Sequence, residues 1–342
     1  MNSKVATKQY EPYTAKDLET DQEVRWCPSC GDFAILKQVQ LTLPKLGIPR
    51  ENIVFVSGIG CSSRFPYYMN TYGIHSIHGR APAIATGLKI TRPELSVWII
   101  TGDGDGLSIG GNHLIHLFRR NPDVNVLLFN NQIYGLTKGQ YSPTSEMYKV
   151  TKSSPYGTVD KPFNPLSLAL GADASFVARS MDKEARHLQR MLERCFYHRG
   201  TSFLEIYQNC NVFNDNAFEV FSNKSSQKRS AIFLEHGKPL AFGENESLGI
   251  VLDGYQPKIV SLQDGYSLND LWIHDEKDLL KAQILVRFFE EDSFPRPFGV
   301  IYAKERLTLE EEIYRQLQDI KNKSDNINLG VLLAGSHSWT VS

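Results

Sequence analysis

The chain has 342 residues, of which 41% are hydrophobic, and this is enough to bury one large core or two smaller ones. Its formal net charge of −1 gives no reason to expect nucleic acid or an anionic membrane as a partner. No apolar run reaches the ~20 residues that would span a bilayer, and the N-terminal stretch lacks the apolar segment of a signal peptide. We therefore expect a cytoplasmic protein.

Helices and buried strands alternate along the first two thirds of the chain. Continuous apolar runs such as 95–100 and 124–129 are typical of strands that are covered on both faces of a parallel sheet. The alternation predicts an α/β fold with a doubly wound, mostly parallel sheet. Strands are predicted at 53–56, 95–100, 124–129, 175–178 and 203–207, and helices at 34–43, 83–90, 108–120, 165–170 and 183–197.

The polar stretch 220–230 is rich in serine and lysine and has no hydrophobic periodicity, so it is the best candidate for a boundary. It divides the chain into a domain at 1–219 and a smaller C-terminal extension at 220–342. The extension contains short strand-like runs and a helix predicted at 307–320, and its sequence indicates no chemistry of its own.

Glycine-rich and amide-rich turns follow two of the predicted strands. Asp103 lies between two glycines after the strand at 95–100, and Asn131 follows the strand at 124–129. Because a crossover helix brings the carboxyl ends of parallel strands together, these side chains are expected at one sheet edge, where α/β sheets bind ligands. Their oxygens suit Mg²⁺. A calcium loop starting at Asp103 is excluded, because its twelfth position is Leu114 and not the required Glu.

Four of the five cysteines form a second pattern. Cys27 and Cys30 form a C-x-x-C pair, which is compatible with a zinc half-site, a thiol–disulfide pair or part of an iron–sulfur cluster. Cys61 and Cys210 follow predicted strands and so belong to the same sheet edge, where four thiolates could hold a cubane cluster. Zinc would need a second ligand pair, and the sequence has none. Cys195 lies among apolar helical positions and is expected to be a buried core thiol.

Two family resemblances rest on these residues. One pattern resembles the thiamine-diphosphate motif: it consists of Gly102-Asp-Gly104, 25 intervening residues and Asn130-Asn131. This resemblance implies that Asp103, Asn131 and the carbonyl of Ile133 hold Mg²⁺ against the diphosphate.

More widely, residues 20–215 resemble the β subunit of 2-oxoacid:ferredoxin oxidoreductases, through the segments 26–31, 58–62, 78–80, 102–113 and 130–140. The resemblance implies thiamine diphosphate, Mg²⁺ and one 4Fe–4S cluster ligated by Cys27, Cys30, Cys61 and Cys210. It also implies a set of cofactor-binding residues: Ile59, Gly60, Cys61, Ser62, His78, Gly102, Asp103, Gly104, Asp105, Asn131, Ile133, Gly135 and Leu136.

The implied activity is CoA-dependent oxidative decarboxylation of a 2-oxoacid, or the reverse carboxylation, with electrons passing through the cluster to ferredoxin. Thiamine enzymes also need a Glu from a pyrimidine-binding domain, and the sequence has no pattern typical of that domain. We therefore expect the chain to be active only with an α subunit, in an αβ or (αβ)₂ assembly.

The segment Leu136, Thr137, Lys138 is similar to that of enzymes acting on 2-oxoglutarate. Lys138 and Arg64 could pair with the second carboxylate of that substrate, although both could instead be solvated surface charges. A relative specific for pyruvate or branched-chain oxoacids, and a zinc-stabilised subunit without catalytic activity, remain alternatives. Asp105 could orient the diphosphate loop or cap the following helix.

Overall fold

The structure is a computed structural model that describes residues 11–291, 293–323, 328–339 and 341. Residues 1–10, part of the N-terminal stretch considered above for a signal peptide, lie outside the described ranges. Within those ranges, no helix combines the length and the apolar character that crossing a membrane requires.

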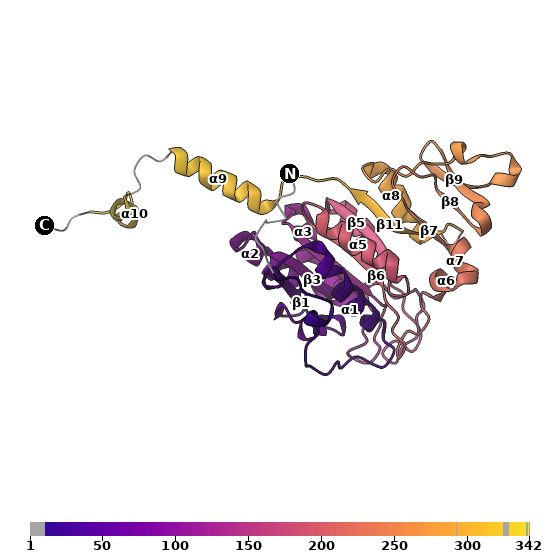
Figure 1. Cartoon of the computed structure of the whole chain (residues 1–342), viewed down its shortest axis with the longest axis horizontal. Helices are drawn as coiled ribbons and strands as arrows, with labels where there is room; N and C mark the ends of the chain where they lie inside the picture. Colours follow the sequence, from indigo (N-terminus) through magenta and orange to yellow (C-terminus); the bar gives the residue numbers. More distant parts are fainter. Residues whose placement is uncertain (1–10, 292, 324–327, 340, 342) are drawn as a thin grey trace.

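An eight-stranded sheet forms the centre of the molecule (Figure 1). Its strand order is β2-β1-β3-β4-β6-β5-β11-β7, and every neighbouring pair is parallel except β5 with β11. This arrangement confirms the predicted α/β class with a mostly parallel sheet. The strands are β1 (Ile53–Ser57), β2 (Tyr72–His75), β3 (Ser96–Gly102), β4 (Val124–Asn130), β5 (Phe176–Met181), β6 (Ser202–Tyr207), β7 (Ala231–Phe233) and β11 (Arg296–Ala303).

Helices cover both faces of this sheet, which explains why its central strands are apolar throughout. Along β3, Val97 and Ile99 belong to one buried cluster, whereas Trp98 and Ile100 belong to the other. The first cluster packs against α2 (Ala81–Thr91), α3 (Gly111–Arg120), α4 (Pro165–Gly171) and α8 (Leu279–Arg287), and the second against α1 (Gly31–Thr42) and α5 (Ala185–Tyr197).

The stretch 220–230, in which the sequence showed no hydrophobic periodicity, is helical. It contains most of α6 (Glu219–Ser222) and all of α7 (Lys224–Ser230). Asn223 lies between them, and its side chain accepts a hydrogen bond from the Ser225 N–H, as an N-cap does. Short helices whose ends are held by capping residues carry no long hydrophobic period, and this is why the sequence pattern missed them.

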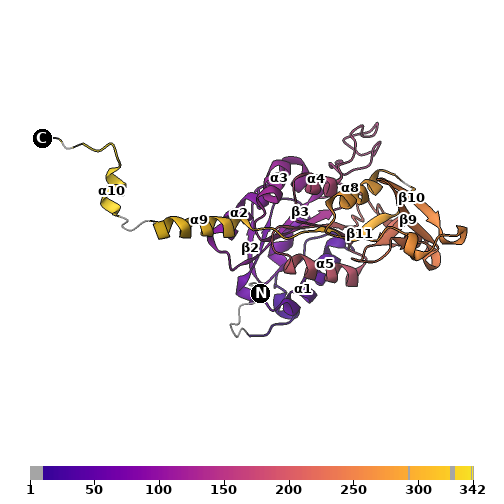
Figure 2. The same cartoon turned by 90° about the horizontal axis from the view of Figure 1, so that it is seen from above.

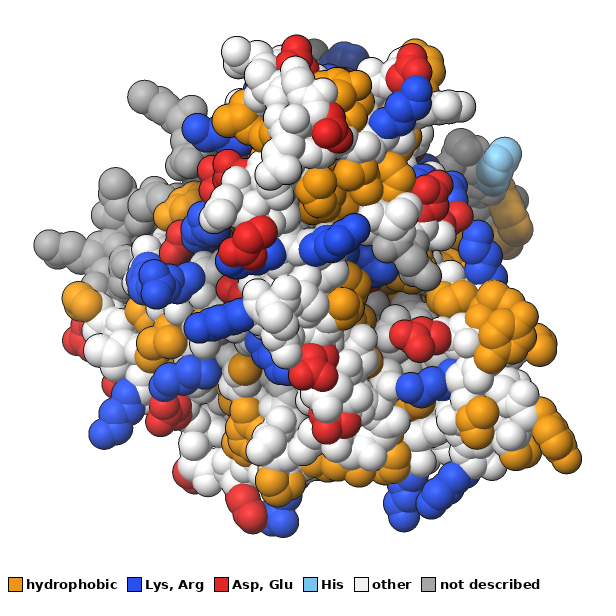
Figure 3. Space-filling view, turned by 90° about the vertical axis from the view of Figure 1, so that its right-hand side faces the viewer, with side chains coloured by type: hydrophobic (Ala, Val, Ile, Leu, Met, Phe, Trp, Pro, Cys, Tyr) orange, Lys and Arg blue, Asp and Glu red, His pale blue; other side chains and the backbone are white. Residues whose placement is uncertain are grey.

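The segment after residue 220 contributes both to the central sheet and to a small sheet of its own. β7 and β11 extend the central sheet beyond β5, and β8 (Ala241–Phe242), β9 (Leu248–Asp253) and β10 (Gln256–Ser261) form a separate antiparallel sheet. The division at residue 220 stays a prediction. On the face at the right of Figure 1, acidic and basic side chains are interspersed among apolar ones (Figure 3), in keeping with the nearly neutral net charge.

The last two helices leave the body of the molecule. α9 (Leu309–Lys323) starts beside α2 and points outward, and α10 (Leu329–Ala334) lies farther out, as both views show (Figures 1 and 2).

Candidate active site

The carboxyl ends of β1, β3, β4 and β6 meet at one edge of the sheet, and the residues singled out from the sequence lie there. The register pairs Gly102 of β3 with Phe129 of β4, so Asp103 and Asn130 leave the sheet next to each other. The chain after β3 forms a π-helical turn, Asp105–Ile109, before α3 begins. The helix predicted over 108–120 therefore starts later, at Gly111, because the residues before it form the π-helical turn.

Asp103 is almost completely buried, with 2% of its surface exposed. One of its carboxylate oxygens, Oδ2, accepts hydrogen bonds from the hydroxyls of Ser142 (2.5 Å) and Thr144 (2.6 Å). Burial raises the pKa of Asp103 to about 6, although the two hydroxyls oppose this shift. A divalent cation beside the carboxylate would offset the cost of burying its charge, so Asp103 suits a metal ligand.

The two adjacent asparagines have different surroundings. Asn130 is buried, and its amide donates to Glu205 Oε1 at 2.7 Å. Asn131 is half-buried, donates to Gln208 Oε1 at 2.9 Å and accepts from the Ile133 N–H at 3.1 Å. The predicted role of Asn131 as a Mg²⁺ ligand stays a prediction.

Asp105 joins three loops and does not cap a helix. Its carboxylate accepts from the backbone N–H groups of Ile59 (3.1 Å) and Gly79 (2.7 Å), and from the Thr101 hydroxyl (2.6 Å). It also lies 2.6 Å from Nδ1 of His78. A Cβ atom on Gly58 would come within 2.0 Å of this carboxylate, so glycine is required there. The predicted residues Ile59 and His78 are thus held next to the loop after β3 through Asp105.

Four of the cysteines converge beside this loop. A Cβ atom on Gly135 would lie 3.5 Å from the Cys61 sulfur and 3.6 Å from the Cys210 sulfur, so both sulfur atoms lie next to Gly135. Burial first, and then the neighbouring groups Asp32, Cys210 and Cys27, raise the pKa of Cys61 to about 12. The pKa of Cys30 is raised for the same reasons, by burial first and then by Asp32, Cys61 and Cys210.

This concentration of thiols fits a multi-iron cluster better than one metal ion. Asp32 is buried next to the thiols, and burial raises its pKa to about 7, although a hydrogen bond with the Cys30 thiol opposes this shift. Positive iron ions would compensate the charge that gathers here when the thiols ionise. Among the described residues, no three or more His, Cys, Asp or Glu side chains lie close enough to hold a metal ion.

Cys195 is fully buried in α5 and contributes to the second core cluster, which confirms its expected structural position. It lies outside the group formed by the other four cysteines.

A cavity of about 500 Å³ lies at the loop after β1, where Ile59 and Gly60 precede Cys61. Arg64 and Leu136 line it together with Ile59 and Gly60, so the structure brings these four predicted residues together. Lys138 is not among its lining residues. The Thr137 hydroxyl donates to Gln140 Oε1 (2.5 Å) within a tight loop. In that loop, the backbone of Lys138 has a left-handed conformation (φ 75°). Arg64 is therefore the better placed of the two predicted cations.

Sequence reasoning missed the polar residues that support Asp103 and Asn130. Ser142, Thr144 and Glu205 are buried, and they contact these two residues from a loop and from β6. A charged residue inside the apolar run 202–207 was a visible signal for Glu205. Nothing in the sequence pattern singles out the two hydroxyls among many serines and threonines.

Comparison with known proteins places this arrangement in a family. Residues 58–206 match the family model described as "Thiamine pyrophosphate enzyme, C-terminal TPP binding domain". The chain is 49% identical over 335 residues to the 2-oxoglutarate oxidoreductase subunit KorB of Mycobacterium tuberculosis, covering 97% of this chain and 89% of that one. The chain belongs to the 2-oxoacid:ferredoxin oxidoreductase family, among its β subunits.

Other relatives of this β subunit support the same family assignment. It is 42% identical to the 2-oxoglutarate synthase subunit KorB of Archaeoglobus fulgidus, over 54% of this chain and 69% of that one. Its fold matches a solved 2-oxoglutarate:ferredoxin oxidoreductase from Magnetococcus marinus, with a TM-score of 0.76 and 30% identity. That match covers 95% of this chain and 97% of the other, whose structure has 2-oxoglutarate, coenzyme A and succinyl-CoA bound. The predicted family and the thiamine-diphosphate-binding fold are thereby confirmed.

Proposed function

We propose that the chain is the β subunit of a 2-oxoglutarate:ferredoxin oxidoreductase, which converts 2-oxoglutarate and CoA to succinyl-CoA and CO₂ and passes two electrons to ferredoxin. The observation that carries the proposal is the convergence of Asp103 and the four cysteines at one sheet edge, beside a cavity lined by Arg64. The names of the relatives, and the compounds bound in the Magnetococcus enzyme, support the choice of substrate.

In this proposal, Asp103, Asn131 and the Ile133 carbonyl hold Mg²⁺ and the cofactor diphosphate, while Cys27, Cys30, Cys61 and Cys210 hold a 4Fe–4S cluster. Bound thiamine diphosphate supplies a carbanion sink for the loss of CO₂, and the cluster accepts electrons one at a time. The chain itself would supply the oxygen donors for the metal and the thiols for the cluster, most of them from loops at one sheet edge. An α subunit supplies the Glu that activates the cofactor ring.

Arg64 recognises the distal carboxylate of the substrate. Its Nη1 donates to the Arg25 carbonyl at 3.1 Å, which fixes the side chain at the cavity. That bond uses one of the five N–H donors of a guanidinium, and the planar fork can still pair with a carboxylate.

The test compares oxoacids in the complex of this chain with its α subunit, with reduction of a viologen dye as the readout. Arg64→Met should raise the KM for 2-oxoglutarate at least about tenfold, because one charge-assisted pair is lost. The KM for 2-oxobutyrate, which has no second carboxylate, should change little. Lys138→Met is the matched control and should affect both substrates equally. Equal effects of Arg64→Met on the two substrates would contradict the role of Arg64, and pyruvate as the best substrate would contradict the proposed specificity.

A further inference from the structure

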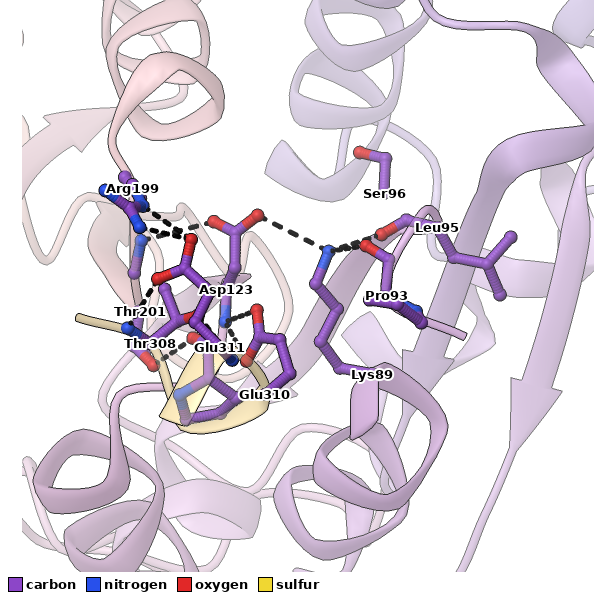
Figure 4. A network of polar contacts seen from close by, with 12 residues as sticks. Lys89, Pro93, Leu95, Ser96, Asp123, Arg199, Thr201, Thr308, Glu310 and Glu311 are labelled. Atoms are coloured by element: carbon purple, nitrogen blue, oxygen red, sulfur yellow. Dashed lines mark hydrogen bonds and ion pairs between the residues drawn. The ribbon is translucent and has the colours of Figure 1, made fainter. Parts of the chain in front are cut away.

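Two networks of buried charges are attached to the central sheet, and they lie at opposite ends of β4. The first begins at Asp123, which directly precedes β4 (Figure 4). The Asp123 N–H donates to the carboxylate of Glu310 at 3.1 Å, and the Asp123 carboxylate lies 3.4 Å from Nζ of Lys89. This network joins the start of α9 to the body of the molecule. The second network reaches Asn130, the last residue of β4, at the edge of the sheet that carries the candidate site.

The second network is built on an ion pair inside the sheet. Arg179 of β5 and Glu205 of β6 are cross-strand neighbours, both are fully buried, and Arg179 Nε donates to Glu205 Oε2 at 2.7 Å. Nη1 of Arg179 donates to the Pro297 carbonyl of β11 at 3.2 Å, whereas Nη2 is buried and has no hydrogen-bond partner among the described residues. A buried ion pair loses about as much through desolvation as it gains from attraction, so stability alone does not account for this pair.

The ion pair fixes the orientation of the Asn130 side chain. Nδ2 of Asn130 donates to Glu205 Oε1 at 2.7 Å, and Oδ1 of Asn130 accepts from the Gln132 N–H at 3.2 Å. A carboxylate can only accept a hydrogen bond and a backbone N–H can only donate one, so a single orientation of the amide satisfies both contacts. Glu205 thus selects the orientation in which the amide oxygen of Asn130 faces the loop after β4.

Gln132 lies between the two residues proposed as magnesium ligands in this loop, and its backbone conformation is unusual. Its φ of 57° is in the left-handed region, which residues with a side chain rarely adopt. Two hydrogen bonds hold it there: its N–H donates to Asn130 Oδ1, and its carbonyl accepts from the Ser145 hydroxyl at 2.6 Å. The first of these closes the turn that asparagine side chains form with the backbone two residues on. The conformation of Gln132 decides how the Asn131 side chain and the Ile133 carbonyl lie relative to each other.

We propose that Glu205, held by Arg179, is a positioning residue for the magnesium site. By fixing the amide of Asn130, it keeps the loop after β4 in the conformation that presents both proposed ligands to one ion. Glu205 acts through Asn130 and not by contact with the ion. Through the bond from Arg179 to β11, the segment after residue 220 takes part in the same support. This inference rests on the proposed function, because it takes Asn131 and the Ile133 carbonyl as ligands.

The experiment measures the dissociation constant of Mg²⁺ by calorimetric titration of the complex of this chain with its α subunit, in excess thiamine diphosphate. In Glu205→Gln, the new amide keeps its oxygen on the Arg179 guanidinium and turns its N–H₂ group towards that of Asn130. The Asn130 amide must then reverse, and its own N–H₂ group meets the Gln132 N–H. The dissociation constant should rise at least about tenfold, as is typical when a residue that supports a metal ligand is lost.

A second change at Asn130 should reverse this loss. Asn130→Asp alone sets two carboxylates against each other and should also weaken Mg²⁺ binding. When Asn130→Asp is combined with Glu205→Gln, the new amide at 205 donates to the new carboxylate at 130, which still accepts from the Gln132 N–H. The total charge of the two side chains is then that of the wild type. The double variant should therefore recover most of the affinity for Mg²⁺ that each single variant loses.

Glu310→Gln is the matched control, because it makes the same change in a glutamate that is also buried, with 4% of its surface exposed, at the other end of β4. It should lower the free energy of unfolding and leave the dissociation constant of Mg²⁺ unchanged. Urea unfolding checks that each variant is folded. Glu205→Gln and Asn130→Asp break the same contact from its two sides, so either single variant that folds tests the inference.

Wild-type affinity for Mg²⁺ in a folded single variant would overturn the inference, and so would a double variant that recovers none of the loss. An equal loss of affinity in Glu310→Gln would also overturn it, because the loss would then follow from removing any buried carboxylate. A wild-type complex that binds thiamine diphosphate without needing Mg²⁺, or not at all, would instead contradict the proposed function, and the inference with it.

Discussion

At the scale of single residues, the site depends on polar side chains that hold Asp103 in place. Thr144 Oγ1 lies 2.6 Å from Asp103 Oδ2 and 2.9 Å from Asn130 Oδ1. A hydroxyl has one proton, and the shorter contact to the carboxylate is the stronger hydrogen bond. Asn130 in turn donates to Glu205, whose other oxygen accepts from Arg179 Nε at 2.7 Å. A chain of buried contacts thus runs from the proposed metal ligand into the sheet.

From these buried contacts we predict that Thr144 positions Asp103 without touching the substrate. Thr144→Val should raise the Mg²⁺ concentration needed for thiamine diphosphate binding about tenfold, since losing a partner of a metal ligand typically weakens binding by that amount or more. Thr144→Ser keeps the hydroxyl and should bind as the wild type does. Calorimetric titration of Mg²⁺ into the complex with excess cofactor measures Mg²⁺ binding by each variant. Equal binding by the valine and wild-type proteins would contradict this role.

At the scale of elements, the four clustered cysteines come from separate parts of the chain. Cys27 and Cys30 precede α1, Cys61 follows β1, and Cys210 follows β6. Backbone and side-chain bonds join these parts: the Trp26 indole donates to the Cys61 carbonyl (2.7 Å), and the Gly31 N–H donates to the Asn209 carbonyl (3.1 Å). The loops are therefore held together by contacts among protein groups, whether or not a cluster is bound.

The proposed cluster makes a clear prediction for these loops. Protein purified without oxygen should be brown and contain four iron and four sulfide ions per chain, and a Cys→Ser change at residue 27, 30, 61 or 210 should lower the iron content strongly. Cys195→Ala is the control and should keep its iron, because this thiol is a core residue of α5. Iron and sulfide analysis provides the measurement. A colourless wild-type protein loaded with zinc would favour the alternative of a structural zinc site.

At the scale of the whole molecule, stability should depend on pH through a buried histidine in α5. His187 in α5 is 5% exposed, and its Nδ1 lies 2.8 Å from the hydroxyl of Ser180, near the carboxyl end of β5. Burial, and to a smaller extent Arg190, lowers the pKa of His187 to about 4. In the unfolded chain the imidazole of His187 takes up a proton near pH 6.5, whereas in the folded chain it does so only at about pH 4.

The free energy of unfolding that His187 contributes is therefore complete above about pH 6.5 and is lost as the pH falls towards 4, by about 3 kcal/mol in all. Asp32 and Asp103, whose pKa values are raised, act in the opposite direction, so the comparison must be made with a variant. Urea unfolding of the wild type and His187→Gln at about pH 7 and about pH 5 measures the difference. A stability gap between the two proteins that does not depend on pH would contradict the prediction.

The sequence determined the class of fold, the sheet edge that carries the site and the separation of Cys195 from the other cysteines. Local patterns sufficed for this, because buried strands and glycine turns are specified by nearby residues. The tertiary structure decided what depends on packing between distant segments: β11 beside β5, the helices in 220–230, Arg64 at the cavity without Lys138, and the hydroxyls on Asp103. Contacts of that kind join residues far apart in the chain, and no local period encodes them.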